Sequence, residues 1–523
     1  MLRSSFVLIL FSLLTQVIGL GLQIALANKF GTGQEVDAYI AALTLPGVVE
    51  ALALAAVAQL LLPLLVRRFA SGQGAEAWRV LSTFVWLLAG GLLLLSIPVA
   101  FGRLTLVRAV APGLDGATLR LAGDYLALLF PGMAFGVAGA LLTQAFHARR
   151  RFTLPALAGA ASQLAPLAAV LLLSDRLGLW SLIGGTLAAK VLALAPLVWI
   201  LAREGAPLRP RIEIGHPEVR RLAWLALPVV VAVTSARLNG AVDRFFVSFL
   251  GEGKLSSLGY ADLVVGLVLA VLVSPVAAVV YPGLADREAQ SDRAGLFRLL
   301  DRGSRWVIAG MLPFVILICL LASPALTVVF EHGRFSDADT ARVAGILACY
   351  GGILLLGGVG SLLVRGFYAI GNTRDPMIWG GLVPLALNVI LDALVFRQWG
   401  VYGVAAVTSA NAILGIPILY VILRRRLGVA PLGGWTGFCI RVGVAGGFMT
   451  LVTRSLAALI PADEGGAAAV VALCLTAFGG LAAYGAAGWI LRIEPLIELA
   501  ARLRLSFRLG GVAVAGVPPG VAR

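Results

Sequence analysis

Residues 7–26 read VLILFSLLTQVIGLGLQIAL, and residues 470–491 read VVALCLTAFGGLAAYGAAGWIL. Each run is long enough for a helix that crosses a hydrocarbon core of about 30 Å, which takes roughly 20 residues. Neither run alternates between apolar and polar residues, as the strands of a membrane barrel do. The first run is also too long for the apolar part of a secretion signal. The sequence therefore predicts an all-α polytopic membrane protein.

Composition extends this prediction to the whole chain. The 523 residues are 60% hydrophobic and 13% charged, whereas soluble globular chains are near half apolar and about a quarter charged. Apolar runs of spanning length recur along the sequence, and we expect about fourteen transmembrane helices. Their approximate ranges are 4–28, 37–66, 79–101, 118–147, 154–174, 178–202, 219–250, 256–284, 303–330, 340–364, 376–395, 400–423, 435–458 and 467–491.

The net charge of +15 has a topological explanation. In a soluble protein such a charge would suggest nucleic acid as a partner, but here the cations gather in alternate loops. These clusters lie at 67–79, 149–151, 203–221, 287–305 and 424–426. By the positive-inside rule, both termini are expected in the cytoplasm. We expect membrane lipid, and no nucleic acid, around the chain.

The sequence offers no catalytic motif. Its four cysteines fall in apolar spans without C-x-x-C spacing, which supports neither a disulfide framework nor a zinc site. It contains no G-x-x-x-x-G-K-[ST], G-x-S-x-G or H-E-x-x-H pattern. We therefore expect no enzyme activity, no catalytic residues and no cofactor.

An internal repeat divides the chain. Phe-Gly-x-Gly at 30–33 precedes a span that ends at Pro63, and Leu-Gly-x-Gly at 250–253 precedes one that ends at Pro282, an offset of about 220 residues. The offset covers an even number of spans, so the two lobes share one orientation, and such carriers bind substrate at the interface between repeats. The expected parts are an N-lobe (1–215, spans 1–6), a C-lobe (216–430, spans 7–12), spans 13–14 (431–495) and a cytoplasmic tail (496–523).

Polar residues occupy spans 1, 2, 7 and 8, where a charge at the centre costs about 2.5–3.5 kcal/mol on insertion scales. We expect them to line a central substrate cavity. They are Gln16, Gln23, Asp37, Glu50, Arg237, Asn239, Arg244 and Asp262. An alternative stays open for Glu50, which could instead neutralise Arg237 or Lys190 inside the bundle. An unpaired arginine pair, Arg237 and Arg244, would suit a phosphate.

Several motifs together resemble the MurJ (MviN) family of lipid II flippases. They are FG-x-G at 30–33, DAY at 37–39, LP at 45–46, GYAD at 259–262, F-x-x-G-x-F at 330–335, GFY at 366–368, DP at 375–376 and GW at 434–435. The resemblance implies two six-helix lobes with two appended helices, within the multidrug/oligosaccharidyl-lipid/polysaccharide exporter superfamily. It also implies a flippase of the bacterial inner membrane that moves a polyprenyl-diphosphate-linked saccharide, lipid II or a related glycan lipid, by alternating access. Such a flippase serves cell-wall synthesis.

The sequence departs from that family in its cavity. Other residues stand where the family has cavity arginines, namely Gln16, Leu22, Glu50, Ala51 and Leu263. Arg237, Arg244 or Lys190 would have to supply the missing charge, or the cargo differs from lipid II. The appended spans resemble the family's groove for the prenyl tail.

A second set of polar residues indicates a cation site. Asn388 and Asp392, at i and i+4, share one helix face, and Asp243, Thr408 and the carbonyl of Val404 add further oxygen ligands. Such hard ligands suit a small hard cation. Some members of the resembled family hold sodium with this set, so the resemblance implies a sodium coupling ion. The alternative is that Asp243 pairs with a neighbouring cation and Asp392 is hydrated near the end of its span.

Two functions of other kinds compete with the flippase. One is a cation-coupled drug exporter of the same superfamily, which would need an aromatic, acidic central cavity. The basic residues and the motifs above argue against it. The other is a non-transporting membrane scaffold for glycan synthesis.

Overall fold

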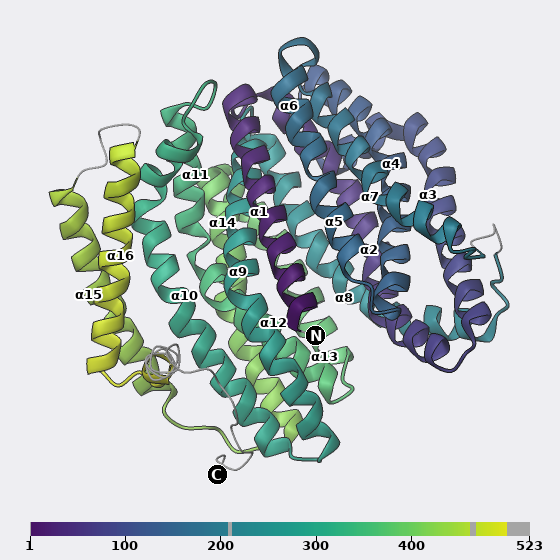
Figure 1. Ribbon diagram of the computed structural model, residues 1–523. Coiled ribbons are helices and arrows are strands. Elements are labelled where there is room, and N and C mark those ends of the chain that lie inside the picture. The colour runs from purple at the N-terminus through teal and green to yellow at the C-terminus, as the bar shows by residue number, and fades with distance from the viewer. Residues whose placement is uncertain (1, 208–211, 461–466, 499–523) are drawn as a thin grey trace. The chain divides into compact units, whose positions relative to one another are not determined.

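The computed structural model describes residues 2–207, 212–460 and 467–498. Its regular elements are helices throughout, and no strand occurs in the described ranges, so the expected all-α class is confirmed (Figure 1). Eleven helical segments there are long and apolar enough to cross a membrane. The expected number of about fourteen spans stays a prediction. Most of the expected tail, 496–523, lies outside the described residues.

The helices run in the following order along the chain. They are α1 (Leu2–Phe30), α2 (Gln34–Ala70), α3 (Gly74–Val110), α4 (Gly116–Ala148), α5 (Thr153–Ser162), α6 (Leu164–Leu177), α7 (Trp180–Arg203), α8 (Pro217–Val247), η1 (Ser248–Leu250), α9 (Lys254–Ala289), α10 (Arg293–Phe330), α11 (Asp337–Cys349), α12 (Gly351–Ala369), α13 (Arg374–Met377), η2 (Ile378–Leu382), α14 (Val383–Leu427), α15 (Trp435–Leu459) and α16 (Ala467–Ile490).

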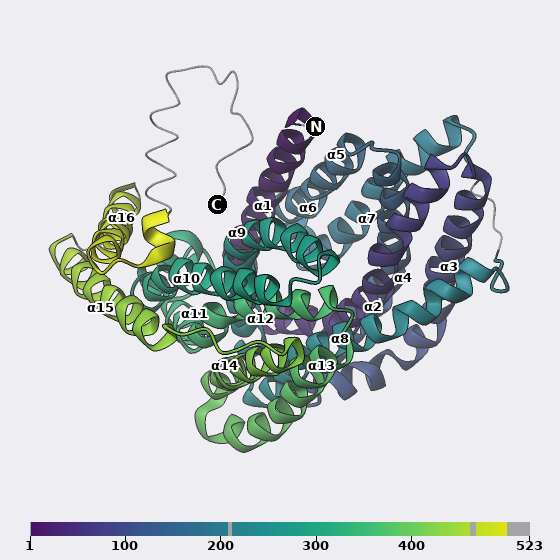
Figure 2. The same ribbon diagram turned by 90° about the horizontal axis from the view of Figure 1, so that it is seen from below.

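Two helix breaks follow from single residues. Gly400 has φ 58° inside α14, a left-handed conformation that favours glycine, and it lies where spans 376–395 and 400–423 were expected to meet. Pro166 has no N–H to donate to the carbonyl of Ser162, the residue at which α5 ends before α6 begins. Figure 2 shows α5 and α6 beside α1, against which both pack.

The chain forms two compact units. Unit 1 contains residues 1–265, 329–350 and 371–419, and unit 2 contains 266–328, 351–370 and 420–523. These units reflect the density of contacts, whereas the expected lobes, 1–215 and 216–430, come from the sequence repeat. The lobe boundaries stay a prediction.

In unit 1, α2, α3 and α7 pack around α4 (Figure 1). Tyr125 and Phe130 of α4 are almost completely buried there. A Cβ atom at Gly132 would lie 2.4 Å from Leu187 Cδ2, so α4 and α7 pack closely here, and a larger residue would require the leucine side chain to shift. Burial of these apolar side chains and close helix contact hold this part of unit 1 together.

The turn after α4 is tied to the end of α7. Arg149 Nη1 donates to Glu204 Oε2 at 2.5 Å, and Arg151 donates to the other carboxylate oxygen. These hydrogen bonds from Arg149 and Arg151 hold the pKa of the Glu204 carboxyl below its ordinary value. Part of one arginine-rich loop is therefore ordered by an acidic partner.

In unit 2, α15 and α16 pack side by side (Figure 1). The Tyr484 hydroxyl of α16 donates to the carbonyl of Ala309 in α10 at 2.9 Å. At the start of α15, Trp435 Nε1 donates to Asp301 Oδ1 at 2.7 Å, and the Tyr420 hydroxyl donates to the same oxygen at 2.6 Å. The appended pair is thus anchored to α10 by both core packing and buried polar contacts.

Candidate functional site

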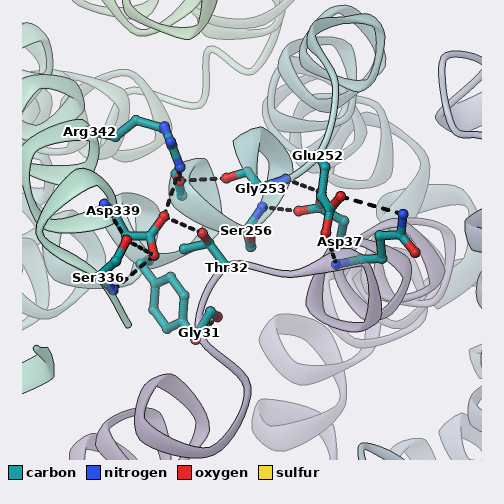
Figure 3. Close-up of polar contacts among 12 residues, drawn as sticks. Gly31, Thr32, Asp37, Glu252, Gly253, Ser256, Ser336, Asp339 and Arg342 are labelled. Carbon is teal, nitrogen blue, oxygen red and sulfur yellow. Dashed lines mark hydrogen bonds and ion pairs between the residues drawn. The ribbon is translucent and has the colours of Figure 1, made fainter. Parts of the chain in front are cut away.

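Asp37 joins the start of α2 to the start of α9 (Figure 3). Its Oδ2 accepts the backbone N–H of Gly253 at 2.6 Å, and its Oδ1 accepts that of Ser256 at 2.7 Å. The residue is only 2% exposed. A carboxylate at a helix N-terminus satisfies N–H groups that have no partner within the helix and complements the helix dipole. Asp37 therefore binds backbone donors in this structure.

A second contact closes the same region (Figure 3). The Thr32 hydroxyl donates to Asp339 Oδ1 at 2.5 Å, and Arg342 Nη1 donates to that oxygen at 2.9 Å. Gly31 has φ 61°, and a Cβ atom there would lie 2.5 Å from the carbonyl oxygen of Arg334. The segments after α1 and after α10 thus pack backbone to backbone, at a point where only glycine fits.

These contacts form one structure, which we call the loop junction and define by Thr32, Asp37, Gly253, Ser256 and Asp339. It connects the loops before α2, α9 and α11. In chain order these loops alternate with the arginine-rich ones, so they belong to the opposite ends of the spans.

Glu50 and Lys190 form an ion pair between α2 and α7. Lys190 Nζ lies 3.0 Å from Glu50 Oε1 and 3.1 Å from Oε2, and the side chains are 29% (Glu50) and 23% (Lys190) exposed. Both line a cavity of about 440 Å³, the N-terminal cavity, which also contains Tyr39, Gly136 and Gln163. Of the two partners considered for Glu50, the structure pairs it with Lys190, and the pair still faces a cavity.

Arg244 lines a second, smaller cavity of about 180 Å³, the arginine cavity, with Gln23, Tyr39 and Tyr260. Its Nη1 donates to the Thr44 hydroxyl at 3.1 Å. Its Nε is buried and has no hydrogen-bond partner in the described chain. A buried guanidinium nitrogen without a partner is unfavourable.

Asp262 completes the surroundings of Arg244. Its Oδ2 lies 3.7 Å from Arg244 Nη2, and its Oδ1 accepts the Tyr350 hydroxyl at 2.8 Å. The contact to the guanidinium is longer than a charge-assisted hydrogen bond of about 2.7–2.9 Å. Arg244 is therefore held in position but only partly neutralised.

The residues expected to hold a cation converge in unit 1. Asn388 Nδ2 donates to Asp243 Oδ1 at 2.5 Å and to Asp392 Oδ2 at 3.2 Å, while the Thr408 hydroxyl donates to Asp243 Oδ2 at 3.2 Å. Asp392 is 0% exposed, and its Oδ1 has no hydrogen-bond partner within the described ranges. Val404, whose backbone carbonyl was expected to be a ligand of the cation, is also fully buried. The cluster holds two buried carboxylates, and neither forms an ion pair with a described residue.

Five of the eight expected cavity residues line neither of these two cavities, namely Asp37 and Asp262, whose contacts are given above, and Gln16, Arg237 and Asn239. Gln16 and Arg237 are exposed and line neither the N-terminal nor the arginine cavity. Asn239 Nδ2 donates to the carbonyl of Ser235 at 3.1 Å, one turn earlier in its own helix. Their role at a substrate site stays a prediction.

Sequence reasoning missed other members of the site. Asn411 Nδ2 donates to Asn388 Oδ1 at 3.0 Å, and its own Oδ1 is buried without a partner in the described chain. It lies three residues after Thr408 and so on the same helix face, a spacing that could have revealed it. Thr44 and Tyr350 gave no such signal, because their partners are distant in sequence.

The sequence is similar to those of known membrane transport proteins. A family model described as "Lipid II flippase MurJ" matches residues 26–462. The lipid II flippase MurJ of Burkholderia cenocepacia is 29% identical over 83% of this chain and 86% of its own length. The probable lipid II flippase MurJ of Rhizobium meliloti is 30% identical over 73% of this chain and 72% of its own.

Solved structures share the fold. A lipid II flippase MurJ in an inward closed conformation matches with a TM-score of 0.77 and 22% identity over 92% of this chain and 98% of that one. An inward-facing multidrug transporter of the MATE family matches with a TM-score of 0.64 and 15% identity over 79% of this chain and 94% of that one.

Proposed function

Because the chain belongs to the MurJ family of lipid II flippases, we propose that it moves a polyprenyl-diphosphate-linked saccharide, lipid II or a related glycan lipid, across the bacterial inner membrane. Arg244 is the observation that carries this proposal. Its guanidinium lines a cavity and is only partly neutralised by Asp262, and the guanidinium fork matches phosphate geometry. Lys190 supplies further positive charge nearby, and Arg237 stays a candidate from the sequence alone.

Alternating access requires the loop junction to open. Asp37 and Thr32 bind residues of the second repeat there, so the contacts of Asp37 with Gly253 and of Thr32 with Asp339 must break before the opposite side of the membrane is reached. We take this junction as the outer gate, with both termini in the cytoplasm and with lobes 1–215 and 216–430 moving against each other. The arginine-rich alternate loops support this orientation.

Sodium is the coupling ion that we propose for this carrier. The donor set fits it, because Asp243, Asp392 and Thr408 present hard oxygen ligands, and Asp392 Oδ1 lacks any partner in the described chain. Asn388 would join them by turning its amide, which in this structure donates to both carboxylates. When bound, the cation would neutralise carboxylates that are otherwise costly in the bilayer. The carbonyl of Val404 is the fifth proposed ligand.

The direct test is transport by purified protein in liposomes that contain labelled lipid II or other polyprenyl-linked sugars. We expect translocation of at least one of these lipids, and we expect Arg244→Ala to abolish it while membrane abundance stays normal. Arg237→Ala, measured in parallel, shows whether the exposed arginine contributes. Transport of organic cations alone would support a drug exporter instead. A protein that transports neither class would be the scaffold.

A further inference from the structure

The Glu50–Lys190 pair places two charged side chains inside apolar helical segments, where charges are energetically unfavourable. Glu50 is in the middle of α2 and Lys190 is in the middle of α7, both within segments that are apolar enough to span a membrane. Each charge there costs at least about 2.5–3.5 kcal/mol on insertion scales. Charged residues at this depth therefore indicate a function by default, with the partner named by the structure.

A contribution to stability is a weak reason for this partly exposed pair. Replacing a buried ion pair with apolar residues of similar volume is often neutral or stabilising. Moreover, α4 leaves room for the pair, because a Cβ atom at Gly136 would lie 2.7 Å from Glu50 Oε1 and 3.0 Å from Lys190 Nζ. Gly136 therefore lies directly beside both charged groups.

The pair also remains open to the N-terminal cavity. The lysine ammonium can donate one more hydrogen bond than Glu50 accepts, and the described chain provides no other acceptor for it. The cavity of about 440 Å³ is much larger than the roughly 30 Å³ that a water molecule occupies. Lys190 is thus a cation with a spare donor, next to space that a ligand can fill.

Tyr39 connects this space with the arginine cavity, since its side chain lines both. The partly neutralised Arg244 and the carboxylate-neutralised Lys190 therefore belong to adjoining cavities. An anion bound by Arg244 in the arginine cavity therefore has a second cation, Lys190, in the adjoining N-terminal cavity.

We propose that Lys190 is an anion-binding residue for which Glu50 acts as an exchangeable internal counterion. A phosphate oxygen of the cargo displaces the Glu50 carboxylate from Lys190, and the carboxylate returns when the cargo leaves. The ligand class is a phosphate or diphosphate ester of a lipid carrier, so this inference rests on the proposed flippase function. It also gives a physical reason for the acidic residue at position 50, which keeps the empty cavity neutral.

The test compares variants of purified full-length protein by calorimetric titration with inorganic pyrophosphate and with farnesyl diphosphate, using farnesol as the uncharged control. Removing the competitor in Glu50→Gln should tighten binding by about tenfold or more, because a charged hydrogen bond of about 1.5–3 kcal/mol no longer opposes it. Lys190→Met should weaken binding by a similar factor. The double variant Glu50→Gln/Lys190→Met removes both charges together. It should bind more weakly than the wild type, because the cation is gone, but no more weakly than Lys190→Met, in which the unpaired Glu50 carboxylate repels the anion.

The sign of the Glu50→Gln effect decides between the two roles. A purely structural pair predicts weaker or unchanged binding in that variant, and either result overturns the proposal. If the wild type flips labelled lipid but Glu50→Gln and Lys190→Met both bind pyrophosphate with the affinity of the wild type, the counterion role is wrong and the flippase function stands. If no anion binds and no lipid moves, both fail. Tighter binding of farnesyl diphosphate but not of pyrophosphate would assign the site to the lipid-linked headgroup, and equal effects would assign it to the diphosphate itself.

Discussion

Substituting Asp37 with alanine should open the loop junction by a predictable amount. The carboxylate accepts two backbone N–H groups, from Gly253 and Ser256, and alanine would leave both without a partner. Hydrogen bonds to a charged group contribute about 1.5–3 kcal/mol each, so the closed junction should lose about 3–6 kcal/mol. At 1.4 kcal/mol for each factor of ten, the ratio of closed to open junction should fall by roughly 10²–10⁴.

The assay is labelling of a cysteine at Ala38, which is 0% exposed beside Asp37, with a membrane-impermeant maleimide. The four native cysteines are first replaced by alanine. We expect faster labelling in Asp37→Ala than in Asp37→Asn, because asparagine keeps one acceptor oxygen but points an amide at the other N–H. Asp124→Ala, which removes an exposed ion pair with Arg103, is the matched control and should label like the wild type. Equal labelling of all variants would refute the argument that Asp37 holds the junction closed.

Three further results are expected. Sodium, but not potassium or choline, should raise the melting temperature of the solubilised protein by mass action, and Asp392→Ala should abolish the rise; a shift that survives in this variant would exclude the site. Trp435→Phe removes a hydrogen bond to Asp301 and should destabilise unit 2 by about 1–3 kcal/mol, whereas Trp489→Phe, at a side chain 60% exposed, should have little effect on the melting temperature. Because its arginine partners lower the pKa of Glu204, that carboxyl contributes stability that is fully present above its unfolded pKa of 4.5 and is lost as the pH falls through the lower folded pKa. Glu204→Gln should therefore be destabilised by about 1 kcal/mol at pH 7 and match the wild type in acid, as melting curves at several pH values would show.

Local features of the fold were predictable because they depend on short stretches of sequence. Apolar length defines a span, and a residue such as Gly400 interrupts one, so the break between spans 376–395 and 400–423 could be expected within a few residues. Gly31 and Gly253 were found as members of the two copies of the repeat, at positions that do not correspond. Both have positive φ values and backbone contacts that exclude a Cβ atom. Hydrophobic length and chain connectivity carry this information without any knowledge of tertiary contacts.

The partners of the charged residues were not predictable in the same way. Helical spacing tells which residues share a face, but the neighbour of that face depends on how the helices rotate and pack. For this reason Glu50 had two candidate partners in the sequence, and only the structure selects Lys190. Asp37 illustrates the same limit, because the backbone donors of Gly253 and Ser256 leave no trace in side-chain composition.

The order of two residues in α8 leads to the final prediction. Asp243 belongs to the proposed cation cluster, through Asn388 and Thr408, while Arg244, the next residue, lines the arginine cavity. Neighbours on a helix point about 100° apart, so one turn of α8 serves both sites, and any shift that a cation favours is transmitted to Arg244. Binding at the two sites should therefore be coupled, and coupling is reciprocal: sodium should tighten pyrophosphate binding by the same factor by which pyrophosphate tightens sodium binding, with typical couplings of about 5–150-fold. Titration of each ligand in the presence and absence of the other measures both factors. Asp243→Asn should reduce both to one, and a wild-type factor of one in either titration would mean that α8 does not link the two sites.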